Sequence, residues 1–366
     1  MRKLTPVVAA DERLTRFREV PGYPGGLYDL GCRTYAWMVP NGSWGESNAG
    51  LIAGGSSSLL VDTQWDLRFT RQMLAAMEPF TRSAPVTRLV NTHADGDHTW
   101  GNQLLAQAEI IASDAAASEM RELRPLAVRM LGLLGRLLSL VRLKGSDRAG
   151  RWFWNMTAPY DFRGVKLTLP TRTFSGSLKI DLDSRPVELI EVGPAHTRGD
   201  VMVFVPDARV LFAGDILFAG STPVMWAGPL ENWLKALDTI LKLDAEIIVP
   251  GHGPITDKDG VREMRAYWEY LDYHVRTRHR QGVPPCRAAR DIVFDTDFLS
   301  QPFARHDSPE RIMTNTHVLY RHLQGRPGPL KTPELIAILW RQALLAHDLP
   351  NARPAVMRNT PGGERP

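Results

Sequence analysis

Four apolar runs in this chain end on histidine or aspartate, and this feature constrains the fold more than any other. The runs TRLVNT, PVELIEVG, RVLFAGD and AEIIVPGHG predict short buried strands. Loops at strand ends can bring distant side chains to one point while the sheet keeps them rigid. The candidate side chains at these four strand ends are His93, Asp95, Asp97 and His98 in NTHADGDH, His196 in GPAHTRGD, Asp215 in FAGD, and His252 in VPGHG.

These residue types favour a metal site. Histidine and carboxylate side chains are the usual ligands of zinc and related divalent ions. A single histidine beside a glycine is more often structural than a ligand. Here four separate strand ends carry candidates in order, and small residues stand next to each of them. The set as a whole therefore predicts a metal centre rather than several unrelated structural residues.

Composition narrows the class of protein and its partners. The chain has 366 residues, of which 43% are hydrophobic and 23% charged, as in a globular protein with one large or two ordinary domains. A net charge of +4 is too small to argue for nucleic acid as a partner. The start of the chain has no run typical of a signal peptide, and no window reaches the roughly 18 apolar residues of a membrane span. We therefore expect a cytoplasmic protein without a transmembrane segment.

The two cysteines, Cys32 and Cys286, fit no metal-binding or redox pattern. We expect them to be unpaired thiols in a reducing compartment, although the sequence leaves a disulfide between them open.

The secondary-structure pattern changes along the chain. Strands and turns are expected at 34–62, with a helix at 66–79, and a second β-rich run begins with VKLTL at 165–169. Beyond residue 256 the pattern becomes helical, at about 257–281, 308–323 and 332–347. The expected parts are an N-terminal segment (1–29), a main domain (30–256) with a helical insertion at about 115–160, a C-terminal helical extension (257–349) and a disordered tail (350–366).

The order of these motifs resembles the metallo-β-lactamase superfamily. The resemblance covers about residues 30–256 and rests on SNAGLI, LLVDT, NTHADGDH, GPAHTRGD, FAGDILF and VPGHGP. It implies an α/β fold: an αββα metallo-β-lactamase sandwich with the metal site at one edge, here with a helical insertion and a C-terminal helical extension. The segment GDILFAG is similar to that of the glyoxalase II-like metallohydrolases. Their glutathione-binding pattern of basic and aromatic residues is not found, so that substrate is not carried over.

The resemblance implies a centre with two divalent metal ions, for which zinc is expected. Asp215 would bridge the two ions, and Asp62 in LLVDT would orient the ligand loop from outside the ligand set. The other ligands would form two sets of three: His93, Asp95 and His196 for the first ion, and Asp97, His98 and His252 for the second.

Asp95 departs from the family motif, H-x-H-x-D-H, which has histidine at this position. Three interpretations compete: Asp95 replaces the histidine as a ligand, or it leaves a mononuclear centre at the second ion, or the site is inactive. We favour the first and disfavour the last, because competent residues fill the other six positions. A carboxylate is a harder ligand than imidazole, so iron or manganese is an alternative to zinc.

The expected activity is hydrolysis by a metal-bound hydroxide. The ions would polarise a carbonyl group and stabilise the oxyanion, and Asp97 and Asp215 are the candidate catalytic residues. Esters, thioesters, lactones and lactams all fit this chemistry. An iron-dependent oxygenase or oxidase on the same fold is the alternative, and a non-catalytic binding protein is a third, weaker interpretation. Iron with a visible absorption band would favour oxidation, and colourless zinc would favour hydrolysis.

The insertion at 115–160 is longer than a simple connection between strands. A helix is expected at 126–143, with a leucine-rich surface and a narrow polar stripe that includes Gly132. This helix could belong to the core or a homodimer interface, form a lid over a small-molecule substrate with an apolar part, or contact anionic lipid. We predict that the insertion forms one wall of the cleft. The candidate substrate-binding residues are Trp44, Trp152, Trp154 and Trp226.

Overall fold

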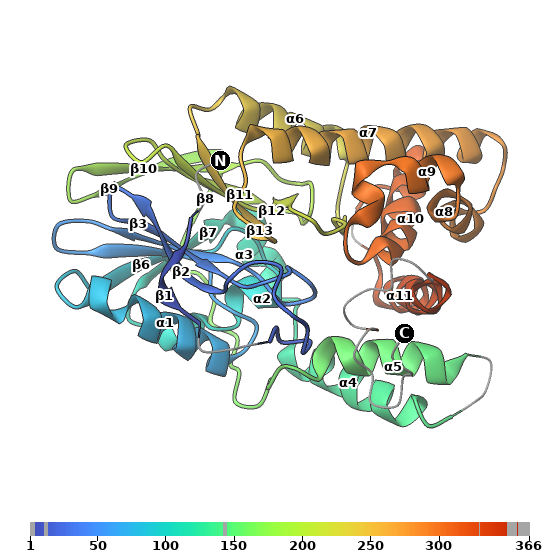
Figure 1. Cartoon of the computed structure of the whole chain (residues 1–366), viewed down its shortest axis with the longest axis horizontal. Helices are drawn as coiled ribbons and strands as arrows, with labels where there is room; N and C mark the ends of the chain where they lie inside the picture. The colour runs from blue at the N-terminus through green and yellow to red at the C-terminus, as the bar shows by residue number, and fades with distance from the viewer. Residues whose placement is uncertain (1–3, 11–13, 142–144, 329, 350–356, 358–366) are drawn as a thin grey trace.

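The computed structural model describes residues 4–10, 14–141, 145–328, 330–349 and 357. Two β-sheets lie face to face, and helices cover the outer face of each sheet (Figure 1). The first sheet has eight strands in chain order: β1 (Pro6–Ala9), β2 (Gly26–Gly31), β3 (Thr34–Met38), β4 (Ala49–Ala53), β5 (Ser58–Val61), β6 (Val86–Val90), β7 (Glu109–Ser113) and β8 (Arg172–Phe174). The second has five, in the order β13 (Ile247–His252), β12 (Val210–Phe218), β11 (Val201–Val205), β10 (Arg185–Glu191) and β9 (Ser177–Leu182).

Strand β5 shows why the expected strands are apolar without interruption. Successive side chains of a strand point to opposite faces of a sheet, and both faces are buried here. Leu59 and Val61 pack between the two sheets, whereas Leu60 packs against helix α1 (Leu67–Thr81). On the other side of the sandwich, helices α6 (Leu230–Lys242) and α7 (Lys258–Arg280) cover the second sheet. The expected αββα arrangement is confirmed.

Most of the expected elements form, and the four apolar runs TRLVNT, PVELIEVG, RVLFAGD and AEIIVPGHG correspond to β6, β10, β12 and β13. The strand expected at VKLTL is wrong. The backbone of this segment bonds to side chains rather than to an adjacent strand. Asn102 donates from Nδ2 to the carbonyl of Thr168 at 3.2 Å, and the amide of Lys166 donates to the side chain of Gln103. Strand β1 was not predicted, and it adds an edge to the eight-stranded sheet within the N-terminal segment.

The insertion consists of α3 (Asp114–Met120), α4 (Pro125–Leu138) and α5 (Ser146–Thr157). Helices α4 and α5 approach closely because glycines stand at their contact. A Cβ atom at Gly135 would lie 2.9 Å from the Cβ of Phe153, and one at Gly150 would lie 2.5 Å from the amide nitrogen of Ser139. The expected polar stripe is therefore wrong at Gly132, which is buried against α5.

The leucine-rich surface of α4 is not covered by the described residues. Leu134 is 52% exposed and Leu137 is 63% exposed, and Leu126, Met130 and Leu133 are exposed beside them. Within the part of the chain that the structure describes, the core does not use this face of α4, which argues against the interpretation that the face belongs to the core. Helix α5 has the opposite character, because its Trp152 and Phe153 are buried in a cluster that includes residues of α11.

The C-terminal extension continues beyond α7 with α8 (Pro285–Val293), α9 (Thr296–Ser300), α10 (Ile312–Leu323) and α11 (Thr332–Asp348). Helices α10 and α11 confirm two of the predictions, whereas α8 and α9 were not predicted. Figure 1 places this group beside the sandwich, and α11 lies close to α5. The expected disordered tail lies outside the described residues, apart from Met357, which is buried.

Both cysteines are free, so the expectation of unpaired thiols is confirmed. Among the described residues, no helix combines the length and apolar character needed to cross a membrane.

The glycine contact between α4 and α5 can be tested. We expect Gly135→Val to lower the free energy of unfolding of the α4–α5 pair by about 1–3 kcal/mol, because the larger side chain would press into Phe153 and the backbone of Trp154. Leu134→Ala is the control on the exposed side, with an expected change within about 0.5 kcal/mol. Urea unfolding combined with hydrogen exchange of the α4 amides would measure both. Equal effects of the two substitutions would contradict this packing.

Candidate metal centre

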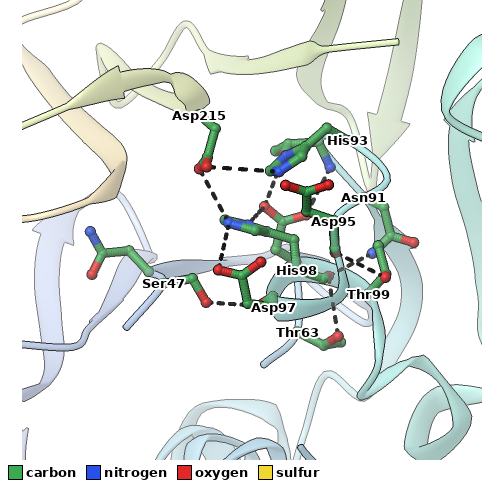
Figure 2. Close-up of polar contacts among 12 residues, drawn as sticks. Ser47, Thr63, Asn91, His93, Asp95, Asp97, His98, Thr99 and Asp215 are labelled. Carbon is green, nitrogen blue, oxygen red and sulfur yellow. Dashed lines mark hydrogen bonds and ion pairs between the residues drawn. The ribbon is translucent and has the colours of Figure 1, made fainter. Parts of the chain in front are cut away.

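The structure brings the sequence-predicted residues together at one edge of the sandwich. His93 and Asp95 lie in the loop after β6, and Asp97 and His98 belong to the short helix α2 (Gly96–Thr99) that follows. The remaining members of the set lie on the second sheet: His196 after β10, Asp215 within β12, and His252 at the end of β13. In Figure 2 the side chains of His93, His98 and Asp215 point toward one another.

Two glycines allow Asp215 to reach this point. Gly214 has a φ of 53°, in the left-handed region that glycine tolerates best, where the register between β12 and β13 shifts. A Cβ atom at Gly251 would lie 1.9 Å from Oδ1 of Asp215, so any larger residue there would occupy the position of the carboxylate. The small residues next to the ligand candidates therefore make space for them.

Asp215 lies at the centre of the cluster. Its carboxylate oxygens are 3.9 Å from Nε2 of His93, 3.2 Å from Nε2 of His98, and 3.4 Å from Nε2 of both His196 and His252. The candidates form two groups of three, His93, His196 and Asp215, and Asp97, His98 and His252. Within each group the ligand atoms all lie within 4.8 Å of one another.

Nε2 of each histidine lies near Asp215, and hydrogen bonds at the second ring nitrogen, Nδ1, orient three of the four histidines. A carbonyl oxygen can only accept, so His196 donates from Nδ1 to the carbonyl of Val224 at 2.6 Å. His98 directs Nδ1 to the carboxylate of Asp62 at 2.9 Å. Thr92 donates its hydroxyl proton to Asp62 at 2.7 Å, so its oxygen is left to accept from Nδ1 of His93 at 3.0 Å. In neutral rings, the lone pairs of Nε2 therefore all face Asp215.

Acceptors that face one another in a buried site require a cation between them. Nε2 of His93, Nε2 of His98 and Oδ1 of Asp215 are buried and have no hydrogen-bond partner among the described residues. Two ligand atoms about 2.1 Å from a tetrahedral zinc ion lie about 3.4 Å apart, and the separations around Asp215 bracket this value. The donor set, the geometry and the unpaired atoms thus all fit divalent metal ions.

Without an ion, protons take up part of this role. Burial opposes the charged form of His196, but the hydrogen bond that His196 donates to Asp95 and the charge of Asp215 outweigh it and raise the pKa of His196 to about 10. By contrast, burial and the neighbouring His98 lower the pKa of His93 to about 4. Since a metal needs the neutral imidazole, ion binding at His196 releases a proton and strengthens as the pH rises.

Asp95 lies beside the first group without belonging to it. Its Oδ2 atom is 3.2 Å from Nε2 of His196 and accepts a hydrogen bond from Nε1 of Trp226 at 3.1 Å. Since Nδ1 of His196 already donates to Val224, a proton or a metal ion must lie between this carboxylate and Nε2. Asp95 is therefore close enough to complete the first ligand set.

Asp62 lies behind the ligand candidates and contacts the loop that carries them. Its carboxylate accepts from the amide and the hydroxyl of Thr92, each at 2.7 Å, and contacts Nδ1 of His98. Asp62 itself has a φ of 62°, a backbone conformation that aspartate tolerates better than most residues. One carboxylate thus orients histidines of both groups.

Asp200 is a supporting residue that the sequence analysis missed. It accepts from the amides of Ala195 and Thr197, each at 3.1 Å, and from the hydroxyl of Thr197 at 2.7 Å, which fixes the loop around His196. Burial raises the pKa of Asp200 to about 7. The signal was present in the sequence, because Thr-x-x-Asp after a strand is a common local hydrogen-bonding pattern.

The four candidate tryptophans lie at different distances from the centre. Trp226 contacts Asp95 directly, and the ring of Trp44 lies 6.4 Å from that of Trp226. Trp152 is fully buried and packs edge-on against Trp44 at 5.7 Å, so it supports Trp44 from behind. The described ring contact of Trp154 is with Arg136 of α4, at 5.2 Å. Of the two insertion tryptophans, Trp152 on α5 therefore reaches the surroundings of the centre. Helix α3 also borders the loop of His196, where Glu119 accepts from the amide of Arg198 at 3.0 Å.

An αββα sandwich with histidine and aspartate groups gathered at one edge defines a class of metallohydrolase fold. Residues 42–252, more than half of the chain, match the family model of the metallo-beta-lactamase superfamily. The chain belongs to this superfamily and is a hydrolase within it, as the sequence resemblance had indicated.

Named relatives differ in how much of each chain is shared. The chain is 25% identical over 300 residues to the 2,4-dinitroanisole O-demethylase subunit alpha of Nocardioides sp. (strain JS1661), covering 79% of this chain and 75% of the relative. It is 24% identical over 234 residues to the linear primary-alkylsulfatase of Pseudomonas sp. (strain ATCC 19151), covering 58% of this chain and 43% of the relative. The chain is 25% identical to the metallo-beta-lactamase type 2 of Bacillus cereus, and the match covers 57% of this chain and 68% of the relative.

Among solved structures, the sec-alkylsulfatase Pisa1 from Pseudomonas sp. aligns with a TM-score of 0.59 at 14% sequence identity. The alignment covers 82% of this chain but only half of that protein. At this identity the similarity shows the shared fold, which extends beyond the sandwich into the helical extension.

The role of Asp95 can be tested by metal content. We expect a crystal structure with zinc to place a carboxylate oxygen of Asp95 about 2.0–2.2 Å from the first ion. We expect Asp95→Ala to lower the number of bound ions per chain from two to one, measured by equilibrium dialysis. Asp95→His restores the family motif and should retain two ions. Wild-type protein that binds one ion, with the same value in Asp95→Ala, would support the mononuclear interpretation.

The role of Asp62 is a second prediction. We expect Asp62→Ala to weaken metal binding about 10–100-fold, because His93 and His98 lose the network that orients them. Asp183→Ala is a matched control, since Asp183 also has a positive φ and accepts hydrogen bonds from backbone amides. Its partners, Ser56 and Ser57, precede β5, whereas Asp62 follows this strand. Equal metal affinities in the two variants, measured by chelator competition, would argue against an orienting role.

Proposed function

We propose that the chain is a two-metal hydrolase that cleaves an ester, thioester or lactone bond in a small molecule with an apolar part. The observation that carries this proposal is the pair of three-residue groups that meet at the buried carboxylate of Asp215. Zinc is the proposed metal, with iron or manganese as alternatives because Asp95 adds a third carboxylate to the centre.

The proposed roles follow from the contacts. When bound, the ions would supply a water molecule activated for attack and a Lewis acid for the carbonyl group. Asp215 would hold both ions, and the histidines of the two groups would complete the ligand sets. Burial opposes ionisation of Asp97, but His98 and His252 outweigh it and lower the pKa of Asp97 to about 2. Its carboxylate is therefore ionised near neutral pH and can accept a hydrogen bond from the attacking water.

Aromatic residues support the apolar part of the proposed substrate. Trp226 is partly buried and donates to Asp95, and Trp44 is partly buried beside Trp226 with Trp152 packed against it. Such rings exclude water and offer an apolar surface close to the reacting bond. Trp154 is the weakest of the four candidates, because its described ring contact lies on α4.

The relatives support hydrolysis over oxidation, because those named alkylsulfatase, hydroxyacylglutathione hydrolase and metallo-beta-lactamase all carry the names of hydrolytic enzymes. A second candidate is the cleavage of an activated aryl ether. It is favoured by the relative named as an O-demethylase subunit, whose similarity extends over 79% of this chain.

The experiment is an activity panel with protein loaded separately with zinc, iron and manganese. The panel contains aryl esters, thioesters and lactones with short and long acyl chains, together with an alkyl sulfate and 2,4-dinitroanisole. Turnover of long-chain esters, thioesters or lactones would support the proposal. Turnover of only the aryl ether would favour the second candidate, and oxygen consumption with iron alone would favour an oxidative function.

Asp215 provides the matching variant. We expect Asp215→Ala to lose bound metal. Its activity should fall by more than the 10–100-fold that is typical when a residue only orients a ligand. Circular dichroism should show an intact fold. Asp272→Ala, which removes an exposed ion pair with Arg276 on α7, is the control and should keep full activity and metal content. Full activity in Asp215→Ala would exclude a two-metal mechanism.

A further inference from the structure

The loop between β12 and α6, residues 219–229, contacts the first ligand group directly. The carbonyl of Val224 accepts from Nδ1 of His196 at 2.6 Å, and the amide of Trp226 donates to the backbone carbonyl of His196 at 2.8 Å. The indole of Trp226 donates to Asp95 at 3.1 Å. The position of this loop therefore decides the orientation of the His196 ring and the Asp95 carboxylate.

Helix α10 of the C-terminal extension holds this loop from the opposite side. Asn315 donates from Nδ2 to the carbonyl of Pro223 at 2.9 Å and accepts at Oδ1 from the amide of Met225 at 2.8 Å. These two contacts enclose Val224 on both sides. Asn315 is completely buried, and its second Nδ2 hydrogen is used toward the hydroxyl of Tyr267 on α7, at 2.9 Å. Both Nδ2 hydrogens and one lone pair of Oδ1 are thus used, which fixes the amide in one orientation.

Two further side chains on the same face bind the ends of this stretch. Arg311, at the N-cap of α10, donates to the carbonyl of Thr222 at 2.8 Å, and His322 donates from Nε2 to the carbonyl of Ala227 at 2.8 Å. Residues 311, 315 and 322 are separated by four and seven positions, so they share one face of the helix. Backbone groups from Thr222 to Ala227 are therefore bonded to a helix that lies outside the sandwich.

We propose that this face of α10 positions the first ligand group, and that Asn315 is its central positioning residue. The inference rests on the proposed metal centre. Without Asn315, the carbonyl of Pro223 and the amide of Met225 lose buried partners, and Val224 is free to move away from His196. The first group, which contains His196, would then bind its ion more weakly. The contacts of Val224 and Trp226 go to His196 and Asp95, so the group of Asp97, His98 and His252 would be affected less.

This proposal gives the extension a defined task. The site would depend on a segment that begins after the last ligand, His252, and belongs to no motif of the sandwich. Its influence would be transmitted through one short loop rather than through contact with the ions. Second-layer partners of this kind commonly change metal affinity about 10–100-fold.

The test compares Asn315→Ala with Thr314→Val in the full-length chain. Thr314 is the preceding residue and is equally buried, and its hydroxyl donates to Gln342 on α11 at 2.6 Å, away from the loop. Both variants lose buried hydrogen bonds and are expected to be less stable, but only Asn315→Ala removes contacts with the loop. The readouts are cobalt(II) titration, followed by visible absorption, and urea unfolding of the metal-free protein.

We expect wild-type protein to bind two cobalt ions. Asn315→Ala should bind one of them at least tenfold more weakly while the other changes by less than twofold. Thr314→Val should keep both affinities within twofold, even if its unfolding midpoint falls as much as that of Asn315→Ala. Unchanged affinities in Asn315→Ala, or equal losses in the two variants, would overturn the inference. Wild-type protein that binds no cobalt would instead show that the proposed metal centre is wrong, and the inference would fall with it.

His322 provides an independent check if Asn315→Ala does not fold. His322→Gln can still donate an N–H toward the carbonyl of Ala227, whereas His322→Ala cannot. We expect the alanine variant to weaken the same cobalt site and the glutamine variant to restore it at least in part. Similar cobalt binding in both variants and in wild type would contradict a positioning role for this face of α10.

Discussion

The structure depends on one electrostatic arrangement, a buried carboxylate surrounded by imidazole nitrogens. The oxygens of Asp215 lie 3.2–3.9 Å from the Nε2 atoms of four histidines, which come from two loops, the short helix α2 and one strand end. Such a group is unfavourable in a protein interior unless a cation or protons neutralise it. The fold therefore fixes these side chains from behind, through Asp62, Asp200 and the carbonyl of Val224. Gly214 and Gly251 provide the space for the carboxylate itself.

The helical extension is part of this arrangement rather than an appendage. Its helix α7 packs against α6, with Trp268 beside Trp233, and these side chains join the second sheet in one continuous core. At the edge nearest the site, that contact becomes polar, and Arg311, Asn315 and His322 bind backbone groups of the loop that carries Trp226. Buried polar contacts are costly when a partner is missing, so they specify one position of the loop more strictly than apolar packing would. The boundary between sandwich and extension at about residue 256 is thus a boundary in sequence pattern, and we propose that it does not separate independent units.

The insertion combines two surfaces with different properties. Helix α5 supplies Trp152 to the aromatic residues around Trp44, whereas α4 packs on α5 through glycines and leaves its leucines exposed. Glycine contacts bring the two helix backbones close together, so the large side chains of α4 have no room on the inner face. An apolar surface of this kind on one helix is unusual for a monomer and is consistent with the homodimer or lipid contact considered from the sequence.

The sequence by itself determined the sandwich, the order of its strands' motifs and the identity of the candidate ligands, because alternation, apolar runs and short motifs are local properties of a chain. It also singled out Asp62 through the family resemblance. It missed Asp200 as a loop-fixing residue, and it wrongly assigned VKLTL as a strand and Gly132 to a polar stripe. Only the tertiary structure decided that Trp226 binds Asp95, and that Asn315 reaches a loop 90 positions earlier in the chain. These contacts join residues far apart in sequence, so no local pattern encodes them. The contact of Asn315, for example, forms only when α10 docks beside the loop that follows β12.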